Sequence, residues 1–172
     1  TEGKTVKKAQ GDGHSLSVRP VYTCGQHQTT QEALRWFRAA AAQGEEHACF
    51  NLGLFHEHGW GGLRRSNRLA AQYYLQAAKR RHAGARFNLG DMFWRGIGVP
   101  RNRARAMQWW RRAARDGEVH ACMRVGIAYG DGHGVRRDMG EARKWLLKAL
   151  RLDEPRAFRW LARLAVRHPG RW

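Results

Sequence analysis

The stretch Ala85-Arg86-Phe87-Asn88-Leu89-Gly90 decides the fold, because its last three residues return along the chain at a nearly fixed interval. Related triplets stand at steps of 37, 36 and 36 residues: Asn51-Leu52-Gly53, Asn88-Leu89-Gly90, Arg124-Val125-Gly126 and, in degraded form, Trp160-Leu161-Ala162. Sequence periods of roughly 20–50 residues are typical of stacked supersecondary units. The period therefore predicts helical hairpins, each of which buries its apolar face only against its neighbours.

A second motif repeats in the same phase and supplies the other helix of each hairpin. Its copies are Ala33-Leu34-Arg35-Trp36-Phe37, Ala70-Ala71-Gln72-Tyr73-Tyr74, Ala106-Met107-Gln108-Trp109-Trp110 and Ala142-Arg143-Lys144-Trp145-Leu146. The first copy precedes the first triplet, so the array begins with the second helix of a hairpin. Helices are predicted at about 31–43, 46–57, 68–81, 83–95, 104–116, 119–129, 140–151 and 155–167. Glycine-rich loops at 59–62, 96–100 and 130–135 permit the tight reversals between them.

These pieces, in this order, resemble the Sel1-like repeat, a relative of the tetratricopeptide repeat. The resemblance rests on Ala85 to Gly90, Gly96-Ile97-Gly98-Val99 and Ala106 to Ala114, and it covers residues 31–165. It implies an all-α fold, a right-handed α-solenoid of helix-turn-helix repeats whose first helices line a concave side. It also implies a protein-binding role, since arrays of this family are similar to adaptors of bacterial envelope, secretion and signalling systems, and some resemble immunity proteins.

The chain departs from the family pattern at both ends of the array. The first loop, Gly59-Trp60-Gly61-Gly62-Leu63, has a shifted spacing, and the last helix has Trp160 and Ala162 where the family has Asn and Gly. The second departure fits a terminal helix whose outer face meets solvent.

Three segments are predicted along the 172 residues. Residues 1–28 form an irregular basic arm, 29–168 form the solenoid, and 169–172 form a short tail. The solenoid starts at Thr29-Thr30-Gln31-Glu32, which has the pattern of a capping box. No stretch approaches the roughly 20 apolar residues that a membrane span needs, so the sequence predicts none.

The charge of the chain indicates an acidic partner. The formal net charge is +18 and the pI is about 11.3. Of 32 basic residues 26 are arginine, which makes forked contacts with carboxylate or phosphate. A codon bias from a GC-rich genome explains the same arginine excess without function and stays an open alternative.

The cysteines do not predict a disulfide framework, because there are only three of them. Cys49 and Cys122 have the same phase two repeats apart, too far for a bridge, and are expected to be buried free thiols. Cys24 with Cys49 is the one plausible pair. The compartment stays undecided between bacterial periplasm and cytoplasm, with the periplasm slightly favoured.

Glycines inside three helices need an explanation, since a helical glycine costs about 1 kcal/mol relative to alanine. Gly53, Gly90 and Gly126 share one phase. We expect them to allow close packing against the alanines of the partner helices, Ala77-Ala78, Ala113-Ala114 and Ala149.

One stripe of the first helices points away from that core and is the predicted partner-binding site. Large apolar residues recur on it, and exposed apolar clusters mark interaction surfaces. Its residues, with the arginines of the last helix, are Phe50, Leu54, Glu57, Phe87, Asp91, Trp94, Arg95, Met123, Ile127, Arg156, Arg159, Arg163 and Arg167. Two alternatives stay open: the Phe and Met positions pack between neighbouring repeats, and the arginine row is an ordinary charged outer face.

Catalysis has little support in the sequence. His56 and His58 are two residues apart and splay to different sides of a helix, which disfavours a metal site. The glycines at 130–134 follow a helix, whereas a dinucleotide fingerprint follows a strand. Enzymes of the β-lactamase-like kind sometimes attributed to cysteine-rich relatives need paired cysteines in every repeat, which this chain lacks. The sequence therefore predicts a non-enzyme with no catalytic residues, no cofactor and no metal.

Nucleic-acid binding is the second hypothesis. Arg101, Arg103, Arg105, Arg111, Arg112 and Arg115 crowd one hairpin around Trp109 and Trp110. Basic residues interleaved with aromatic residues are typical of single-strand binding. However, the repeat phase places both tryptophans in the core, so a protein partner, acidic or mixed apolar-acidic, is the first choice.

Overall fold

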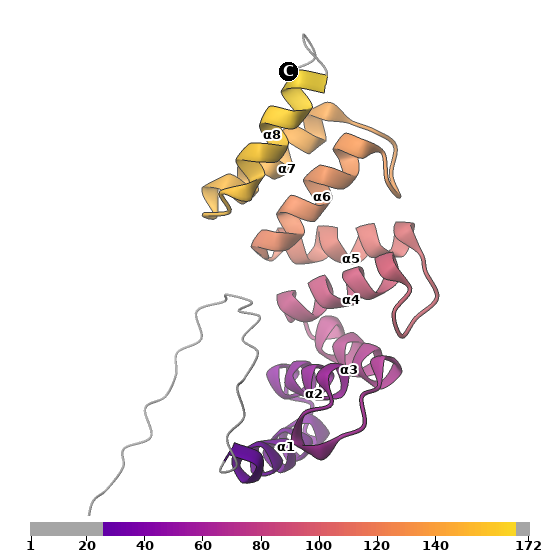
Figure 1. The fold of residues 1–172 in the computed structure, drawn as a ribbon, viewed down its shortest axis with the longest axis vertical. Coiled ribbons are helices and arrows are strands. Elements are labelled where there is room, and N and C mark those ends of the chain that lie inside the picture. The colour runs from indigo at the N-terminus through magenta and orange to yellow at the C-terminus, as the bar shows by residue number, and fades with distance from the viewer. Residues whose placement is uncertain (1–25, 168–172) are drawn as a thin grey trace, which may run out of the picture.

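The protein is a single stack of helices (Figure 1). The computed structural model describes the backbone of residues 26–167 and the side chains of residues 30–166. The helices are α1 (Gln26–Ala42), α2 (Glu46–His58), η1 (Trp60–Gly62), α3 (Asn67–Lys79), α4 (Ala83–Arg95), α5 (Arg103–Arg115), α6 (Val119–Asp131), α7 (Met139–Arg151) and α8 (Arg156–Arg167). No strand occurs among the described residues, so the all-α prediction is confirmed.

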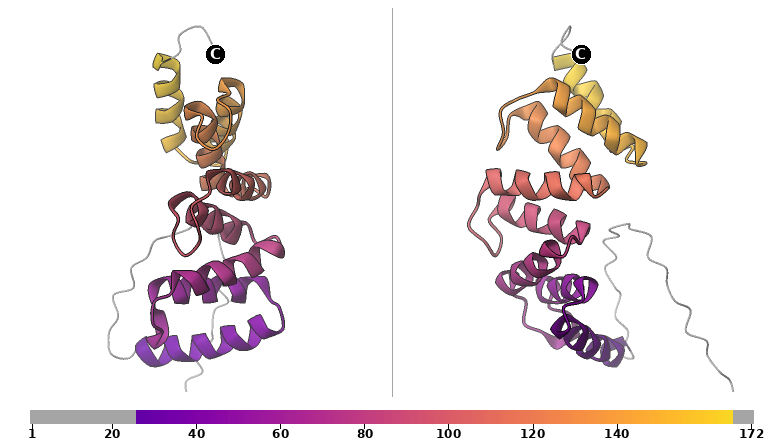
Figure 2. Two further views of the ribbon diagram at one scale, coloured as in Figure 1. Left: turned by 90° about the vertical axis from the view of Figure 1, so that its right-hand side faces the viewer. Right: turned by 180° about the vertical axis from the view of Figure 1, so that it is seen from behind.

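The helices stack in chain order along the long axis of the molecule, from α1 to α8. The closest packing lies within the pairs α2/α3, α4/α5 and α6/α7, which are the predicted hairpins. Helix α1 precedes the first complete hairpin as a single second helix, and α8 follows the last one as a single first helix. Figure 2 shows that the stack twists, because α1 and α8 run in different directions. Within residues 26–167, no helix is long and apolar enough to cross a membrane.

The helix boundaries follow from polar caps and glycines that repeat with the period. Ser66, Asn102 and Asp138 begin α3, α5 and α7, and each side chain accepts a hydrogen bond from the backbone N–H three residues later, at 3.3, 2.9 and 2.9 Å. Glycines with φ of 75°, 75° and 74° end α2, α4 and α6: Gly59, Gly96 and Gly132. The glycine-rich loops are therefore where the sequence predicts them.

The predicted start of the first helix is wrong. Helix α1 begins at Gln26, so Thr29 and Thr30 lie inside the helix and do not cap it. Residues 26–30 contain neither Pro nor Gly, and nothing in their sequence stops the helix from extending. Residues 1–25 and 168–172, which include most of the predicted arm and tail and Cys24, lie outside the described residues.

The helical glycines make room for large side chains and not for the predicted alanines. A Cβ at Gly53 would overlap the Tyr74 ring, one at Gly90 would overlap the Trp110 ring, and one at Gly126 would lie 2.7 Å from Leu146 Cγ. These three side chains are 0–1% exposed. Each hairpin is thus closed by a large residue of its second helix lying on a glycine of its first. The alanine explanation fails because the larger side chain reaches the glycine first.

The aromatic position one residue before Tyr74 and Trp110 in the repeat was expected to lie in the core, but it is not fully buried. Trp36 is 75% exposed, and Trp109 is half-buried beneath the Arg112 guanidinium, 5.0 Å from the ring centroid. One residue further along, Trp110 is fully buried. A helix turns about 100° per residue, so adjacent aromatic residues cannot both face the same partner.

Candidate protein-interaction surface

A row of apolar residues crosses the first helices of successive repeats. Phe50, Phe87 and Met123 take the same place in α2, α4 and α6, and each is half-buried. The Phe50 ring stacks at 4.3 Å between centroids on His82, the residue that caps α4, and the Phe87 ring lies 5.9 Å from His120 of α6. The row therefore packs between repeats, as one alternative predicts, and keeps part of each residue at the surface.

Leu54, Ile127 and Trp94 widen this row. Leu54 and Ile127 are half-buried against the core clusters. Trp94 lies at the end of α4, with its ring 5.1 Å from the Trp110 ring and beneath the Arg103 guanidinium, also at 5.1 Å. All six apolar residues predicted for the site thus combine a packing contact with a partly exposed surface.

The two carboxylates predicted for the site are used inside the stack. Glu57 Oε2 accepts a hydrogen bond of 2.6 Å from the Tyr74 hydroxyl. Asp91 Oδ2 pairs with Arg124 Nη2 at 3.3 Å, which links α4 to α6. Burial raises the pKa of Asp91, against the opposing effect of Arg124 and Arg95. Arg95 itself is exposed, so arginine is the charge that this surface offers to a partner.

The arginines of α8 are not a uniform ladder. Arg156 donates two hydrogen bonds to Glu154, from Nε at 2.7 Å and from Nη2 at 2.8 Å. Glu154 is 5% exposed and also lies 3.3 Å from His120 Nδ1. Hydrogen bonding from Arg156 lowers the pKa of Glu154 to about 2. Arg156 is therefore held in an internal ion pair.

The remaining arginines of the predicted row differ in what they contact. Arg159 and Arg163 are exposed, and the Arg163 guanidinium lies over the Trp160 ring at 4.9 Å. Arg167 ends α8, and its side chain is outside the described set. Of the four predicted arginines, Arg159 and Arg163 are thus the two whose described side chains are available to a partner.

The two described thiols are buried, as predicted. Cys49 is 1% and Cys122 0% exposed, and both are free. Cys49 Sγ lies 3.7 Å from Gln76 Oε1, and Cys122 Sγ lies 3.6 Å from the Ala114 carbonyl. Burial raises the pKa of both thiols, and the thiolate is the reactive form. Neither cysteine has the environment of a nucleophile.

One group of side chains has the donor types and spacing for a cation. Ligand atoms of Glu45, Glu46 and His47, at the start of α2, lie within 4.8 Å of one another. Glu45 already accepts hydrogen bonds from the backbone N–H groups of His47 and Ala48, as the cap of the helix. The capping role accounts for the position of this carboxylate, and the group has no buried ligand.

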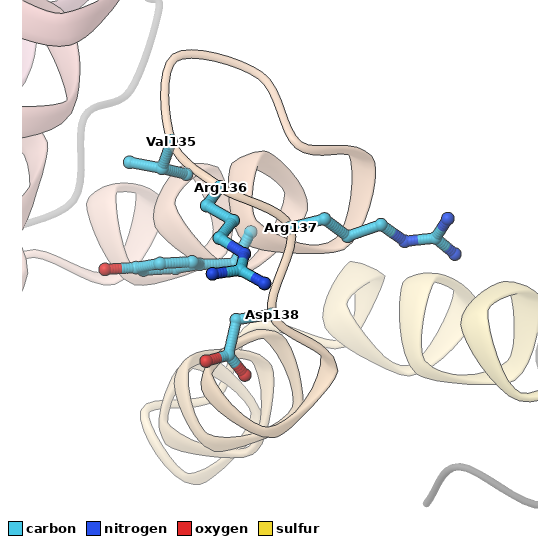
Figure 3. A pocket seen from close by; sticks show the side chains of 5 residues that line it. Val135, Arg136, Arg137 and Asp138 are labelled. Atoms are coloured by element: carbon cyan, nitrogen blue, oxygen red, sulfur yellow. The ribbon is translucent and has the colours of Figure 1, made fainter.

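An open hollow of about 510 Å³ lies beside the loop after α6 and is lined by Tyr129, Val135, Arg136, Arg137 and Asp138. Figure 3 shows Arg136 turned toward Asp138 while Arg137 points away. The Asp138 carboxylate caps α7. The hollow includes no residue of the predicted site and lies on the loop edge of the stack.

Two side-chain contacts were missed by the sequence reasoning. His82 caps α4 and carries the ring on which Phe50 stacks. His82 lies one period from the caps Glu45 and Glu118, and this position in the repeat could have indicated its capping role. Arg86 pairs with Asp116 from a position where other repeats have a buried cysteine. A charged residue at that core phase should have indicated a pair.

Comparison with known families follows the same divisions. The Sel1 repeat model matches residues 30–45, 46–82, 83–118, 119–154 and 150–165. The chain belongs to the Sel1 repeat family. Sel1 repeat proteins are in general protein-interaction scaffolds, and the family is typically non-catalytic. The half-match at 30–45 agrees with an array that begins on a second helix.

Solved structures show the same solenoid. A protective antigen of uropathogenic Escherichia coli strains with an SLR fold is 34% identical, with a TM-score of 0.76 over 80% of this chain and 29% of that one. A Sel1 repeat protein from Oxalobacter formigenes is 27% identical, with a TM-score of 0.68 over 79% and 58%. Helicobacter pylori cysteine rich protein B, 21% identical with a TM-score of 0.57 over 76% and 93%, shares the fold. This Sel1 repeat chain spans less than two thirds of the length of the first two of these proteins.

Proposed function

We propose that this Sel1 repeat protein is a non-catalytic scaffold that holds an acidic or mixed apolar-acidic protein segment against its first helices. The row of Phe50, Phe87 and Met123 carries the proposal, since it presents partly exposed apolar surface at the same place in three successive repeats. A periodic row suits an extended or helical segment that runs along the stack. Partly buried aromatic anchors are the residues that commonly dominate binding energy.

Electrostatics supports an acidic partner. The carboxylates on this surface, Glu57 and Asp91, are bonded to Tyr74 and Arg124, whereas Arg95 is exposed. With a formal charge of +18, the protein attracts acidic partners at long range and repels basic ones. Arg159 and Arg163 of α8 add exposed positive charge at one end of the row.

The proposed setting is bacterial. The Sel1 repeat structures from Escherichia coli and Oxalobacter formigenes support that setting. Within it, we propose an adaptor associated with the envelope or secretion, or an immunity protein that neutralises a toxin by binding it, with the periplasm favoured over the cytoplasm.

Affinity capture from nuclease-treated lysate of the source cells, at moderate and at high salt, tests the scaffold. The test variant is Phe87→Ala with Trp94→Ala, and the matched control is Trp36→Ala, an aromatic residue that is 75% exposed outside the row. A protein that stays bound in high salt, and is lost with the test variant only, supports the proposal. Since Trp94 packs on Trp110, thermal melts must first show that the test variant is folded.

Nucleic-acid binding is the second candidate, and one observation favours it. Trp109 is only half-buried and lies beneath Arg112, so part of its ring is available for stacking on a base. Arg111 and Arg115 are exposed on the same helix. Replacing Arg111, Arg112 and Arg115 by Glu should abolish binding of a fluorescent single-stranded DNA and its steep salt dependence. Capture that ignores the Phe87 variant and collapses in salt or with nuclease favours this candidate.

A further inference from the structure

The outer face of α8 exposes apolar residues at positions that are buried in the other repeats. Phe158 is 65% exposed, whereas its equivalents Cys49 and Cys122 are at most 1% exposed. Leu161 is half-buried, whereas its equivalents in the preceding repeats are 0–2% exposed: Leu52, Leu89 and Val125. Val166, on the same side of the helix, is 81% exposed. We refer to Phe158, Leu161, Ala162 and Val166 as the α8 face.

The stack itself shows what kind of element covers such a face. In each complete hairpin the equivalent face is covered by the next helix, through a large residue flanked by alanines. In α3 these are Ala70, Tyr74 and Ala77, and in α7 they are Ala142, Leu146 and Ala149, all 0% exposed. The spacing of i, i+4 and i+7 places the three residues on one side of an amphipathic helix.

Ala162 limits the size of the residue that a covering helix can place on it. It stands where the other first helices have glycine, and Leu146 Cγ comes to 2.7 Å from the Cβ that Gly126 would carry. The methyl group of Ala162 leaves less room than any of these glycines. At the α7 spacing even leucine would come closer than 3.0 Å to this methyl group, so a covering helix has to lie slightly farther from α8 than α7 lies from α6, and a central leucine fits better than the tyrosine or tryptophan of α3 and α5.

The charges beside the α8 face indicate which kind of helix it attracts. At 100° per residue, Arg159 borders the α8 face on the side of Val166, and Arg163 lies one step farther round the helix with its guanidinium over the Trp160 ring; both are exposed. Glu154, the buried carboxylate before α8, is already engaged by Arg156. The border is thus positive, and it attracts a helix whose flanks carry Asp or Glu.

A second copy of this chain fits the face by pattern but not by charge. Its helix α1 carries the spacing Ala33, Phe37 and Ala40, yet α1 also has exposed Arg35 and Arg38. Like charges would meet across that contact, which disfavours it.

We propose that the α8 face is a second binding surface, which takes an acidic amphipathic helix of a partner protein. It shares Arg159 and Arg163 with the proposed scaffold surface but does not depend on the row of Phe50, Phe87 and Met123, because Phe158 and Val166 lie on the last described helix, at the end of the stack (Figure 1).

A designed peptide tests this surface with the 172-residue chain. The probe is a labelled, covalently stapled helix with the sequence of residues 139–151, in which Arg143, Lys144, Lys148 and Arg151 are replaced by Glu. Fluorescence anisotropy should show that it binds at least tenfold more tightly than the unmodified basic sequence. Adding Leu146→Glu makes the probe more acidic, so a further loss of binding would show that the apolar face is required.

Protein variants locate the binding. Phe158→Glu should weaken binding of the acidic probe at least tenfold, while Trp36→Glu, at the opposite end, should leave it within twofold; both side chains are largely exposed, so both variants should fold. Arg159→Glu with Arg163→Glu should reverse the preference, so that the basic peptide binds more tightly than the acidic one.

Three results would overturn the proposal. They are equal binding of acidic and basic probes, binding that survives Phe158→Glu, and self-association of the chain that Phe158→Glu abolishes, which would make a second copy the occupant. Loss of binding with Phe87→Ala and not with Phe158→Glu would place the peptide in the first-helix row and leave the scaffold proposal intact.

Discussion

Single glycines set the distance between the two helices of each repeat. Gly90 lies beneath the Trp110 ring, and no side chain fits between them. Gly84, on the same helix, has His82 and Phe50 at 3.4 and 3.6 Å from its would-be Cβ, which is ordinary contact. The two positions therefore differ in the room for a Cβ: Gly90 has none, and Gly84 has enough.

Gly90→Ala should therefore destabilise the fold by about 2 kcal/mol, since overpacking a tight contact costs about 1–3 kcal/mol. Gly84→Ala is the matched control and should be neutral or stabilising by up to about 1 kcal/mol, because alanine is the better helix former. Urea unfolding followed by circular dichroism measures both. Equal effects of the two variants would show that packing on Trp110 does not set the requirement for glycine.

The turns between repeats contain a second informative residue. Gly44 and Gly117 have φ of 82° and 92°, and the equivalent positions Arg81 and Asp153 have φ of 72° and 66°. A residue with a Cβ is destabilised by about 1–2 kcal/mol in this left-handed region. Glycine avoids this strain, but part of the gain is offset because glycine has more conformational entropy in the unfolded state.

Arg81→Gly should stabilise the protein by about 0.5–1 kcal/mol, because it relieves this strain and sacrifices only a surface contact to Asp116 at 3.9 Å. The control is Gly117→Ala, which has open space around the new Cβ and should lose about 1 kcal/mol through the backbone alone. Denaturant midpoints give both values. A destabilised Arg81→Gly would mean that the Arg81 contacts outweigh the strain.

At the scale of the element, each first helix begins from a residue of the same phase. Glu45, His82 and Glu118 cap α2, α4 and α6 with their side chains. Glu154 takes this place before α8, where it also accepts a hydrogen bond from the backbone N–H of Arg156 at 3.2 Å. The last helix is thus anchored to the stack through one buried carboxylate.

Glu154→Gln should destabilise the protein by about 1–3 kcal/mol at pH 7, since it removes the charge of a buried carboxylate that is paired with a partly exposed arginine but keeps the shape. The folded-state pKa of Glu154 is about 2, below its ordinary value of 4.5. The stabilisation is therefore complete above about pH 4.5 and disappears as the pH falls toward 2. Unfolding curves at pH 7, 4 and 2.5 should show the difference between variant and parent shrinking.

The control for this pH dependence is Glu32→Gln, because Glu32 is exposed on α1. Its stability should follow that of the parent at every pH. If Glu154→Gln also follows the parent curve in parallel between pH 7 and 2.5, the carboxylate does not supply the proposed anchor.

The sequence predicted the elements well because caps, glycines and apolar residues repeat in one phase. The boundaries of α2 to α8 lie within two residues of the predicted ones. The start of α1 was missed, since Thr29-Thr30-Gln31-Glu32 has the capping pattern but the helix continues past it to Gln26. A local pattern marks where a helix can start, and it does not stop a preceding helical turn.

At the scale of the whole molecule, the sequence could identify the row of large residues but not how far it is covered. Phe50, Phe87 and Met123 were placed on one stripe correctly, but the rings that contact the first two belong to the following first helices, His82 as the cap of α4 and His120 in α6. Contacts between repeats depend on the angle between successive hairpins, which no periodicity specifies. The ion pair of Arg156 with Glu154 was not foreseen either, although the two residues are only two positions apart.

Because equivalent interfaces use equivalent residues, a whole repeat should be removable. Deleting residues 83–118 joins His82 to Val119 and sets Ala121 and Cys122 of α6 against Ala77 and Ala78 of α3, in place of Ala113 and Ala114. All five of these alanines and Cys122 are 0–1% exposed in the parent. In a quasi-one-dimensional array the product should fold cooperatively, with a melting temperature lowered on the order of 10 °C.

Circular dichroism melts and near-ultraviolet spectra measure this outcome against a deletion that breaks the order of helices. Removing residues 83–100 takes away α4 and its loop, so that α3 is followed directly by α5 and two second helices must pack together. The deletion removes Gly90, on which the Trp110 ring lies, and α3 offers no glycine in its place, so this protein should lose its cooperative transition. Cooperative melting of both deletions would show that the helices stack without regard to phase, whereas failure of both would show that the array folds as one indivisible unit.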